Sequence, residues 1–125
     1  MEGYTVKIKN CNQELTGKQR VAIKDISNAI ALDEVVTVDE HLIINPDVVA
    51  ELEVHNEKAE RKDYAVYVII DKNGKKYTTS SESFFTSYKD IAEEMAGETE
   101  EWALDGYKLE SKNFKGKYFI TCTII

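Results

Sequence analysis

The sequence predicts a mainly β fold with one principal helix, and three observations support this fold class. A nearly continuous run of β-forming residues extends from Asp63 to Asp71. An amphipathic pattern over Phe84–Met95 predicts the helix, and strict alternation from Tyr118 onward predicts a last strand. This order of elements matches the second half of a five-stranded OB-type barrel. We therefore expect an OB-fold-like five-stranded barrel or a highly curved antiparallel sheet, formed by a single domain over residues 1–125.

The first half of the chain contains two predicted strands around a segment that fits no single period. Apolar residues alternate with threonine and lysines over residues 4–9, which predicts a half-buried strand with one lysine-bearing face. Residues 14–32 match neither the helix nor the strand period, so we expect a short helical turn followed by an irregular segment. Asn45-Pro46-Asp47 predicts a turn because proline fixes φ. Alternation from Val48 to Val54 then predicts the second strand.

A hairpin and the principal helix are predicted in the middle of the chain. The strand over Asp63–Asp71 ends at Asn73-Gly74, a pair that favours a type I′ turn with two positive φ angles. The return strand is expected over Lys75–Thr79. Thr79-Ser80-Ser81-Glu82 has the spacing of a capping box, and Gly97 is well placed to end the helix. The apolar stripe of this helix consists of Phe84, Tyr88, Ile91 and Met95.

Two more strands are predicted after the helix. Trp102 and Leu104 share one strand phase, whereas Tyr107 and Leu109 are shifted by one residue. We therefore expect a β-bulge at Asp105-Gly106 that keeps Trp102 and Tyr107 in the core. A turn over residues 112–116 leads into the last strand.

The net charge of −7 argues against nucleic-acid binding until the distribution of the charges is considered. Residues 25–60 carry ten acidic and one basic residue, and residues 82–101 carry seven and one. The remaining segments, 1–24, 61–81 and 102–125, are net basic and coincide with predicted strands. Because salt screens charges beyond roughly 8 to 10 Å, a basic face gathered by the fold is able to act locally.

Catalytic and metal-binding motifs are missing from the sequence. His41 and His55 are 14 residues apart, without a zinc-ligand spacing, and no phosphate-binding loop or nucleophile elbow occurs. The glutamates of residues 93–101 are typical of a solvated face rather than a metal site. We therefore expect no catalytic residue, no metal and no cofactor, and a protein that is not an enzyme.

The cysteines and the apolar pattern indicate the compartment. Cys11 and Cys122 lie on or beside apolar strands without a CxxC spacing, so we interpret them as reduced packing residues. No apolar run reaches the roughly 20 residues that span a bilayer. Residues 1–10 contain no signal-peptide core. The sequence therefore predicts a cytoplasmic protein without membrane contact.

One succession of motifs is similar to a known family. Gly74-Lys75-Lys76-Tyr77-Thr78-Thr79-Ser80 precedes the helix, and Ser111-Lys112-Asn113-Phe114-Lys115-Gly116-Lys117-Tyr118-Phe119 follows it. In this order the chain resembles small bacteriophage single-stranded-DNA-binding proteins, especially those of protein-primed phages. The likeness covers roughly the last 60 residues. It implies sequence-tolerant coating of displaced DNA strands, or of RNA, during phage replication in the host cytoplasm, with phage or host replication proteins as further partners.

Such a function needs aromatic rings that stack on bases and cations that follow the phosphates. Phe114 is the best single candidate because it lies in a polar turn, where a buried role is least expected. The candidate stacking residues are Tyr67, Tyr77, Phe114 and Phe119, and the candidate phosphate contacts are Lys7, Lys9, Lys72, Lys75, Lys76, Lys112, Lys115 and Lys117.

A second class of function stays open from the sequence. The acidic block over residues 25–60 is suited to docking on a basic host or replication protein, or to imitating the charge of DNA. The alternative is therefore an acidic protein-protein interaction module that does not bind nucleic acid.

Overall fold

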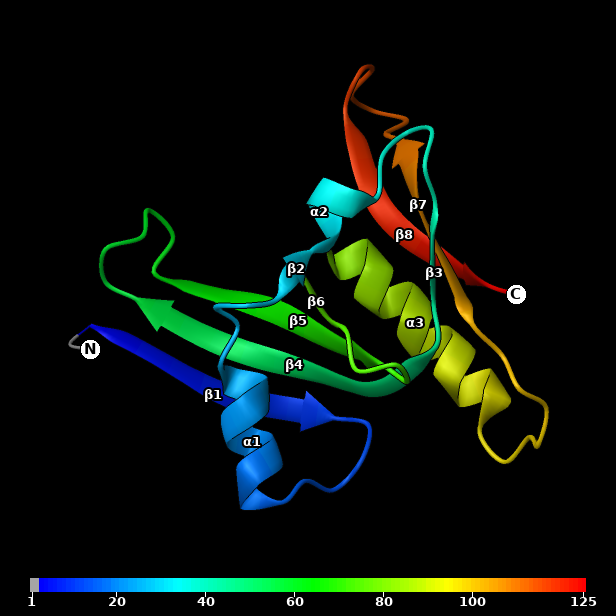
Figure 1. Ribbon diagram of the computed structural model, residues 1–125. Coiled ribbons are helices and arrows are strands. Elements are labelled where there is room, and N and C mark those ends of the chain that lie inside the picture. Colours follow the sequence, from blue (N-terminus) through cyan, green and yellow to red (C-terminus); the bar gives the residue numbers. More distant parts are fainter. Residues whose placement is uncertain (1–2) are drawn as a thin grey trace. The chain divides into compact units, whose positions relative to one another are not determined.

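The computed structural model describes residues 3–125 and groups the chain into two compact units, each built from two separate segments. Unit 1 contains residues 1–30 and 47–80, and unit 2 contains residues 31–46 and 81–125. Figure 1 labels their helices and strands. The described strands form two sheets, one of five strands and one of three. A mainly β fold with one principal helix is therefore confirmed, whereas the closed OB-type barrel is not.

Unit 1 is organised around the five-stranded sheet, in the order β1-β4-β5-β6-β2. Strand β1 pairs antiparallel with β4, and β5 pairs antiparallel with β6. The short strand β2 spans the boundary between the units. The elements of this unit are β1 (Tyr4–Cys11), α1 (Gly17–Lys24), β2 (Ile30–Ala31), β4 (Pro46–Asn56), β5 (Asp63–Asp71) and β6 (Lys76–Thr79).

The core of unit 1 lies between α1 and one face of its sheet. The register pairs Val6 with Val54 and Ile8 with Leu52, so these side chains point to the same face. Ile23 of α1 is buried in the same apolar cluster. Helix α1 begins at Thr16, whose hydroxyl and the Gln19 side chain form a capping box. The Thr-x-x-Gln spacing was therefore a helix signal inside the segment that we expected to be mostly irregular.

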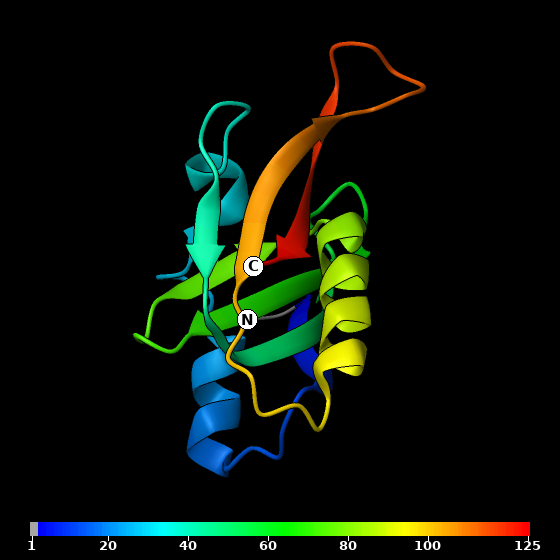
Figure 2. The ribbon, with the colours of Figure 1, turned by 90° about the vertical axis from the view of Figure 1, so that its right-hand side faces the viewer.

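Unit 2 combines the principal helix with the three-stranded antiparallel sheet, in the order β3-β7-β8. Helix α3 packs along β8. Leu104 and Ile44 are fully buried, and Phe84 of α3 is buried with them. Figure 2 shows the β7–β8 hairpin extending away from α3 toward its turn. The elements of this unit are α2 (Leu32–Val35), β3 (Leu42–Ile44), α3 (Glu82–Met95), β7 (Leu104–Glu110) and β8 (Tyr118–Ile124).

The principal helix and its ends agree closely with the sequence. The Ser81 hydroxyl accepts a hydrogen bond from the Phe84 backbone N–H, two residues later in the chain than the expected cap at Thr79. The same hydroxyl donates to the Ile120 carbonyl at 2.6 Å, which joins the start of α3 to β8. Gly97 follows the helix with φ of +84°, as expected of a glycine that ends a helix.

The predicted turn at Asn45-Pro46-Asp47 is wrong. Asn45 is the single residue between β3 and β4, which belong to different sheets, and Pro46 is the first residue of β4. Proline is tolerated at the start of a strand, where its missing N–H removes no interior ladder bond. The proline thus marks a change of sheet rather than a reversal of the chain.

The β5–β6 hairpin has a different turn from the predicted type I′. The Gly74 N–H bonds to the Asp71 carbonyl, and Gly74 has φ of +93°. Asn73 is not among the positive-φ residues, so only one of the two central φ angles expected of a type I′ turn is of that sign. The geometry is that of a type I turn followed by a glycine bulge, the usual three-residue hairpin. The Asp71 carboxylate stabilises this turn by accepting from the Asn73 N–H at 2.9 Å.

The predicted bulge at Asp105-Gly106 is also wrong. The register of β7 on β8 runs without a shift from Leu104 to Glu110. A Cβ at Gly106 would lie 3.6 Å from Phe84 Cε2 and 3.4 Å from the Leu42 carbonyl oxygen. The aromatic ring therefore occupies the inward position at Gly106, so the strand needs no extra residue to restore its apolar face.

Candidate nucleic-acid interface

The β7–β8 hairpin exposes apolar and aromatic side chains on the face that we call the outer face. Leu109 pairs with Phe119 and Tyr107 pairs with Thr121, so all four side chains share one face of the sheet. Leu109 is exposed and the Phe119 side chain is 37% exposed. Tyr107 and Phe119 are diagonal neighbours on adjacent strands, a relation within reach of aromatic side chains. The outer face is therefore a short aromatic stripe along the hairpin.

The tip of the hairpin continues this stripe with a ring and a cation. Phe114 is 63% exposed, and the Lys117 Nζ lies 5.8 Å from the centroid of its ring. The Lys117 N–H bonds to the Phe114 carbonyl, and Gly116 has φ of +86°, which defines a type II turn. A glycine at this position is required by the positive φ. The turn therefore holds Phe114 out of the core, as the sequence predicts.

Basic residues surround the tip. Residues 107–119 contain four lysines and one glutamate. Lys112 and Lys115 are exposed in the turn, beside Lys117. The structure thus brings together Lys112, Phe114, Lys115, Lys117 and Phe119, five of the twelve predicted site residues, in one hairpin.

Tyr107 and His41 are an aromatic pair that the sequence analysis missed. Their rings stack with centroids 5.6 Å apart and planes inclined by 25°. The His41 Nδ1 lies 3.1 Å from both carboxylate oxygens of Asp105, which holds the imidazole beside β7. We expected Tyr107 in the core, but it is half-buried at the outer face. Its strand phase, shared with Leu109, was the signal that would have placed it there.

The opposite face of the hairpin has a different character. Tyr118 is 47% exposed and pairs with Glu110 across the strands. The Glu110 carboxylate raises the pKa of the Tyr118 hydroxyl, by its charge and by a hydrogen bond. Next to Tyr118, Ile120 points into the core. Tyr118 therefore provides an exposed ring on the same strand as Phe119 but outside the outer face.

The two tyrosines predicted as stacking residues in unit 1 do not offer a ring to a base. Tyr67 of β5 and Tyr77 of β6 are each 5% exposed. Burial raises the pKa of the Tyr77 hydroxyl, with a smaller contribution from the Asp71 charge. Both residues lie in strands rich in apolar side chains, where one strand phase cannot be distinguished from the other by sequence. We correct the predicted interface by removing them.

The lysines of the β5–β6 hairpin divide into two groups. Lys76 donates from Nζ to the Ala22 carbonyl at 2.7 Å and to the Asp25 carbonyl at 2.9 Å. It thereby satisfies backbone acceptors at the C-terminal end of α1, where a cation is favoured. Lys72 and Lys75 are exposed at the turn. Lys76 therefore has a structural role, and only the other two remain available to a phosphate.

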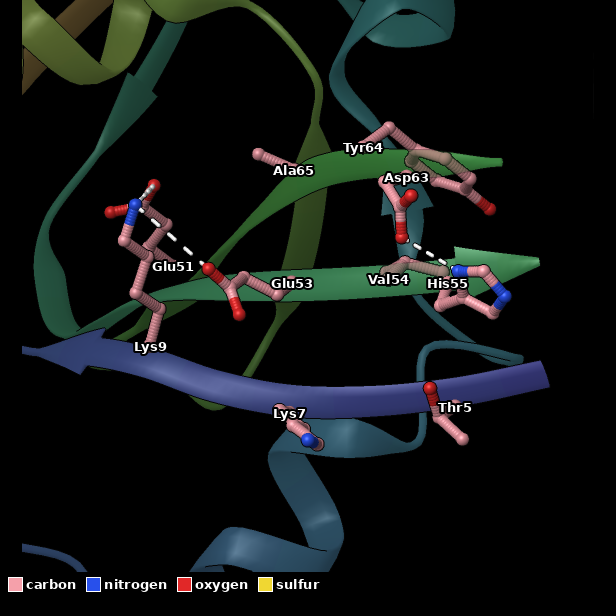
Figure 3. A pocket seen from close by; sticks show the side chains of 10 residues that line it. All are labelled: Thr5, Lys7, Lys9, Glu51, Glu53, Val54, His55, Asp63, Tyr64 and Ala65. Carbon is pink, nitrogen blue, oxygen red and sulfur yellow. Dashed lines mark hydrogen bonds and ion pairs between the residues drawn. The ribbon is translucent and has the colours of Figure 1, made fainter. Parts of the chain in front are cut away.

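Lys7 and Lys9 line a pocket in unit 1 that is not basic. Figure 3 shows this pocket, of about 430 Å³, over β1, β4 and β5. The Lys9 Nζ lies 3.9 Å from the Glu51 carboxylate and 4.0 Å from that of Glu53. Glu53 is also the cross-strand partner of Lys7. Glutamates thus alternate with the lysines, and this face does not have the single sign of charge that phosphate binding needs.

His55 bridges two carboxylates at one end of the same pocket. Its Nδ1 lies 2.6 Å from Asp63 Oδ1, and its Nε2 lies 2.6 Å from Glu57 Oε1. Lys62 also reaches Glu57, at 3.2 Å. An imidazole that donates from both nitrogens carries a positive charge. The hydrogen bond to Asp63, followed by that to Glu57, accordingly raises the pKa of His55 above its ordinary value of 6.5.

We expect the connection between β4 and β5 to loosen as the pH rises. The pKa of His55 is raised in the folded state, so its stabilising effect is complete below about 6.5 and is lost as the pH passes through the folded pKa. Hydrogen exchange of the backbone amides of residues 57–62 should accelerate above this pH by more than the intrinsic pH dependence. In the His55→Gln variant this excess should be absent, and an equal excess in both proteins would contradict the prediction.

Other candidate sites receive no support in the part of the chain that the structure describes. Within residues 3–125, no group of three or more histidine, cysteine or acidic side chains is placed to hold a metal ion. No helix in this part of the chain has the length and apolar character needed to cross a bilayer. Burial raises the pKa of the Cys122 thiol to about 12, so this sulfur is present as the unreactive thiol.

Comparison of the chain with protein-family models, curated proteins and solved structures gives no match. The functional argument therefore rests on the geometry and charge of the β7–β8 hairpin.

Proposed function

We propose that the protein binds single-stranded DNA without strong sequence preference, through the outer face and the tip of the β7–β8 hairpin. The observation that carries this proposal is the exposure of Phe114 and Phe119 together with Lys117 on one hairpin. Each base that stacks on an aromatic side chain contributes about 1 to 3 kcal/mol, whatever its identity. The turn and the strand register hold both rings in place before binding, which reduces the entropy lost on association.

The local charge of the hairpin supports this role despite the net charge of −7. Four lysines and one glutamate lie within residues 107–119, whereas the acidic residues are concentrated in other segments. Salt screens charges beyond roughly 8 to 10 Å, so a strand at the hairpin tip interacts mainly with the nearby lysines. The lysines are therefore suited to follow the phosphates while the rings stack on the bases.

The biological setting is part of the proposal. A sequence-tolerant binder of this kind would coat displaced strands in phage DNA replication, in the host cytoplasm and without enzymatic activity, and RNA is a further possible ligand. Replication proteins are the corresponding protein partners. An OB-like relation between the strands belongs to the proposal through the family resemblance. The proposed role does not depend on a closed barrel, because an open antiparallel sheet is also able to stack bases on its surface.

Titration of a labelled oligo(dT) and a duplex of equal length, each at two salt concentrations, tests the proposal. We expect fluorescence anisotropy to show tighter binding of the single strand, with log affinity falling linearly against log salt. Neutralisation of three or four phosphates gives a slope of about −2 to −3 for a single strand. If no anisotropy change occurs and the protein instead forms a stable complex with a basic protein partner, the acidic interaction module becomes the better description.

A further inference from the structure

A groove in unit 2 adjoins the aromatic stripe of the hairpin. It lies between α3 and β8 and has a volume of about 390 Å³. Phe119 belongs both to the groove and to the outer face. The residues that line the groove are Glu82, Ser83, Thr86, Ser87, Phe119 and Thr121.

The lining has the chemistry of a site for a polar, uncharged ring rather than for a phosphate. Among the six described residues that line it, Glu82 is the one charged residue, and four others carry hydroxyl groups. The hydroxyls of Ser87 and Thr121 lie 3.1 Å apart and hydrogen bond to each other, so they form a fixed polar wall. A carboxylate repels phosphate but accepts hydrogen bonds from N–H donors. A ring that stacks on Phe119 is therefore best matched to the groove if it carries an amino group.

We propose that the groove receives one unstacked nucleobase that carries an exocyclic amino group, with the Glu82 carboxylate accepting from that group. This inference rests on the proposed binding of single strands and adds a subsite with a base preference to it. The strand then lies with its phosphates near the lysines of the hairpin tip and with one base turned toward α3. Cytosine meets the requirement through its N4 amino group, whereas uracil presents a carbonyl oxygen at that position.

Oligo(dC) and oligo(dU) of equal length are the appropriate probes because their bases differ only in the groups around this position. We expect the wild-type protein to bind oligo(dC) about three- to tenfold more tightly than oligo(dU), the range that one hydrogen bond of this kind supports. Glu82→Gln should reduce this ratio to about twofold or less, because the amide presents donors as well as an acceptor. Affinities are measured by fluorescence anisotropy at one fixed salt concentration.

Glu94→Gln is the matched control. Glu94 lies on the same helix and its replacement removes the same charge, but it does not line the groove. This variant should keep the wild-type ratio between the two oligonucleotides. Equal ratios in the wild type and in Glu82→Gln would overturn the subsite and leave single-strand binding intact. Failure of the wild type to bind either oligonucleotide would overturn both proposals.

Discussion

Phe84→Ala is expected to lower the free energy of unfolding by about 3 to 5 kcal/mol, the usual cost of removing a buried phenylalanine side chain. Phe84 is 1% exposed, and its ring fills the space above Gly106 that a side chain would otherwise occupy. Because Gly106 has no atoms with which to fill a cavity, relaxation around the substitution should be limited. Urea denaturation followed by circular dichroism measures the change.

Phe85→Ala is the matched control for this prediction. Phe85 is the next residue of α3, but it is half-buried, and its ring lies 5.7 Å from the Lys89 Nζ and 6.2 Å from the Tyr88 ring centroid. Removal of this ring should cost clearly less than removal of Phe84. Equal losses for the two variants would show that the packing around Gly106 does not have the proposed importance.

The double variant Phe114→Ala/Phe119→Ala is expected to weaken binding of oligo(dT) by about 2 to 6 kcal/mol, because each stacked ring contributes about 1 to 3 kcal/mol. Both side chains are substantially exposed, so the free energy of unfolding should change far less than the affinity. The comparison of the two quantities, from anisotropy titration and urea denaturation, decides between a binding role and a structural role. A large loss of stability with unchanged affinity would assign the rings to packing.

Tyr118→Ala separates the outer face from the hairpin as a whole. Tyr118 is adjacent to Phe119 and is exposed to a similar extent, but it points to the opposite face and hydrogen bonds to Glu110. Its removal should leave the affinity for oligo(dT) within about a factor of two, well below the loss expected for one stacked base. An equal loss of affinity for Tyr118→Ala and Phe119→Ala would mean that the two faces do not differ in binding.

Local patterns in the sequence were sufficient to predict the elements that depend on local interactions. The bounds of β5, the end of α3 at Met95 and the start of β8 at Tyr118 all agree with the structure. Each depends on β-forming residues, helix periodicity or a turn glycine within a few positions. Exposure of Phe114 was also predictable, because polar residues and glycine surround it in the turn.

The remaining features depend on contacts between residues far apart in the chain. The burial of Tyr67 and Tyr77 follows from packing that a continuous β-forming run does not indicate. The engagement of Lys76 by the end of α1, and the stacking of His41 on Tyr107, join positions separated by more than 50 residues. Likewise, the absence of a bulge in β7 depends on the ring of Phe84, which occupies the inward position at Gly106.

The assembly of each unit from two chain segments has a consequence for synthesis on the ribosome. The chain passes from one unit to the other at residues 30/31, 46/47 and 80/81. Strand β3 finds its partner only in β7, which is translated about 60 residues later. Until then the apolar Leu42–Ile44 segment remains unpaired in the nascent polypeptide, while the segments of unit 1 are complete once Ser80 has emerged. Vectorial folding would thus finish one half first and leave the other dependent on the last codons.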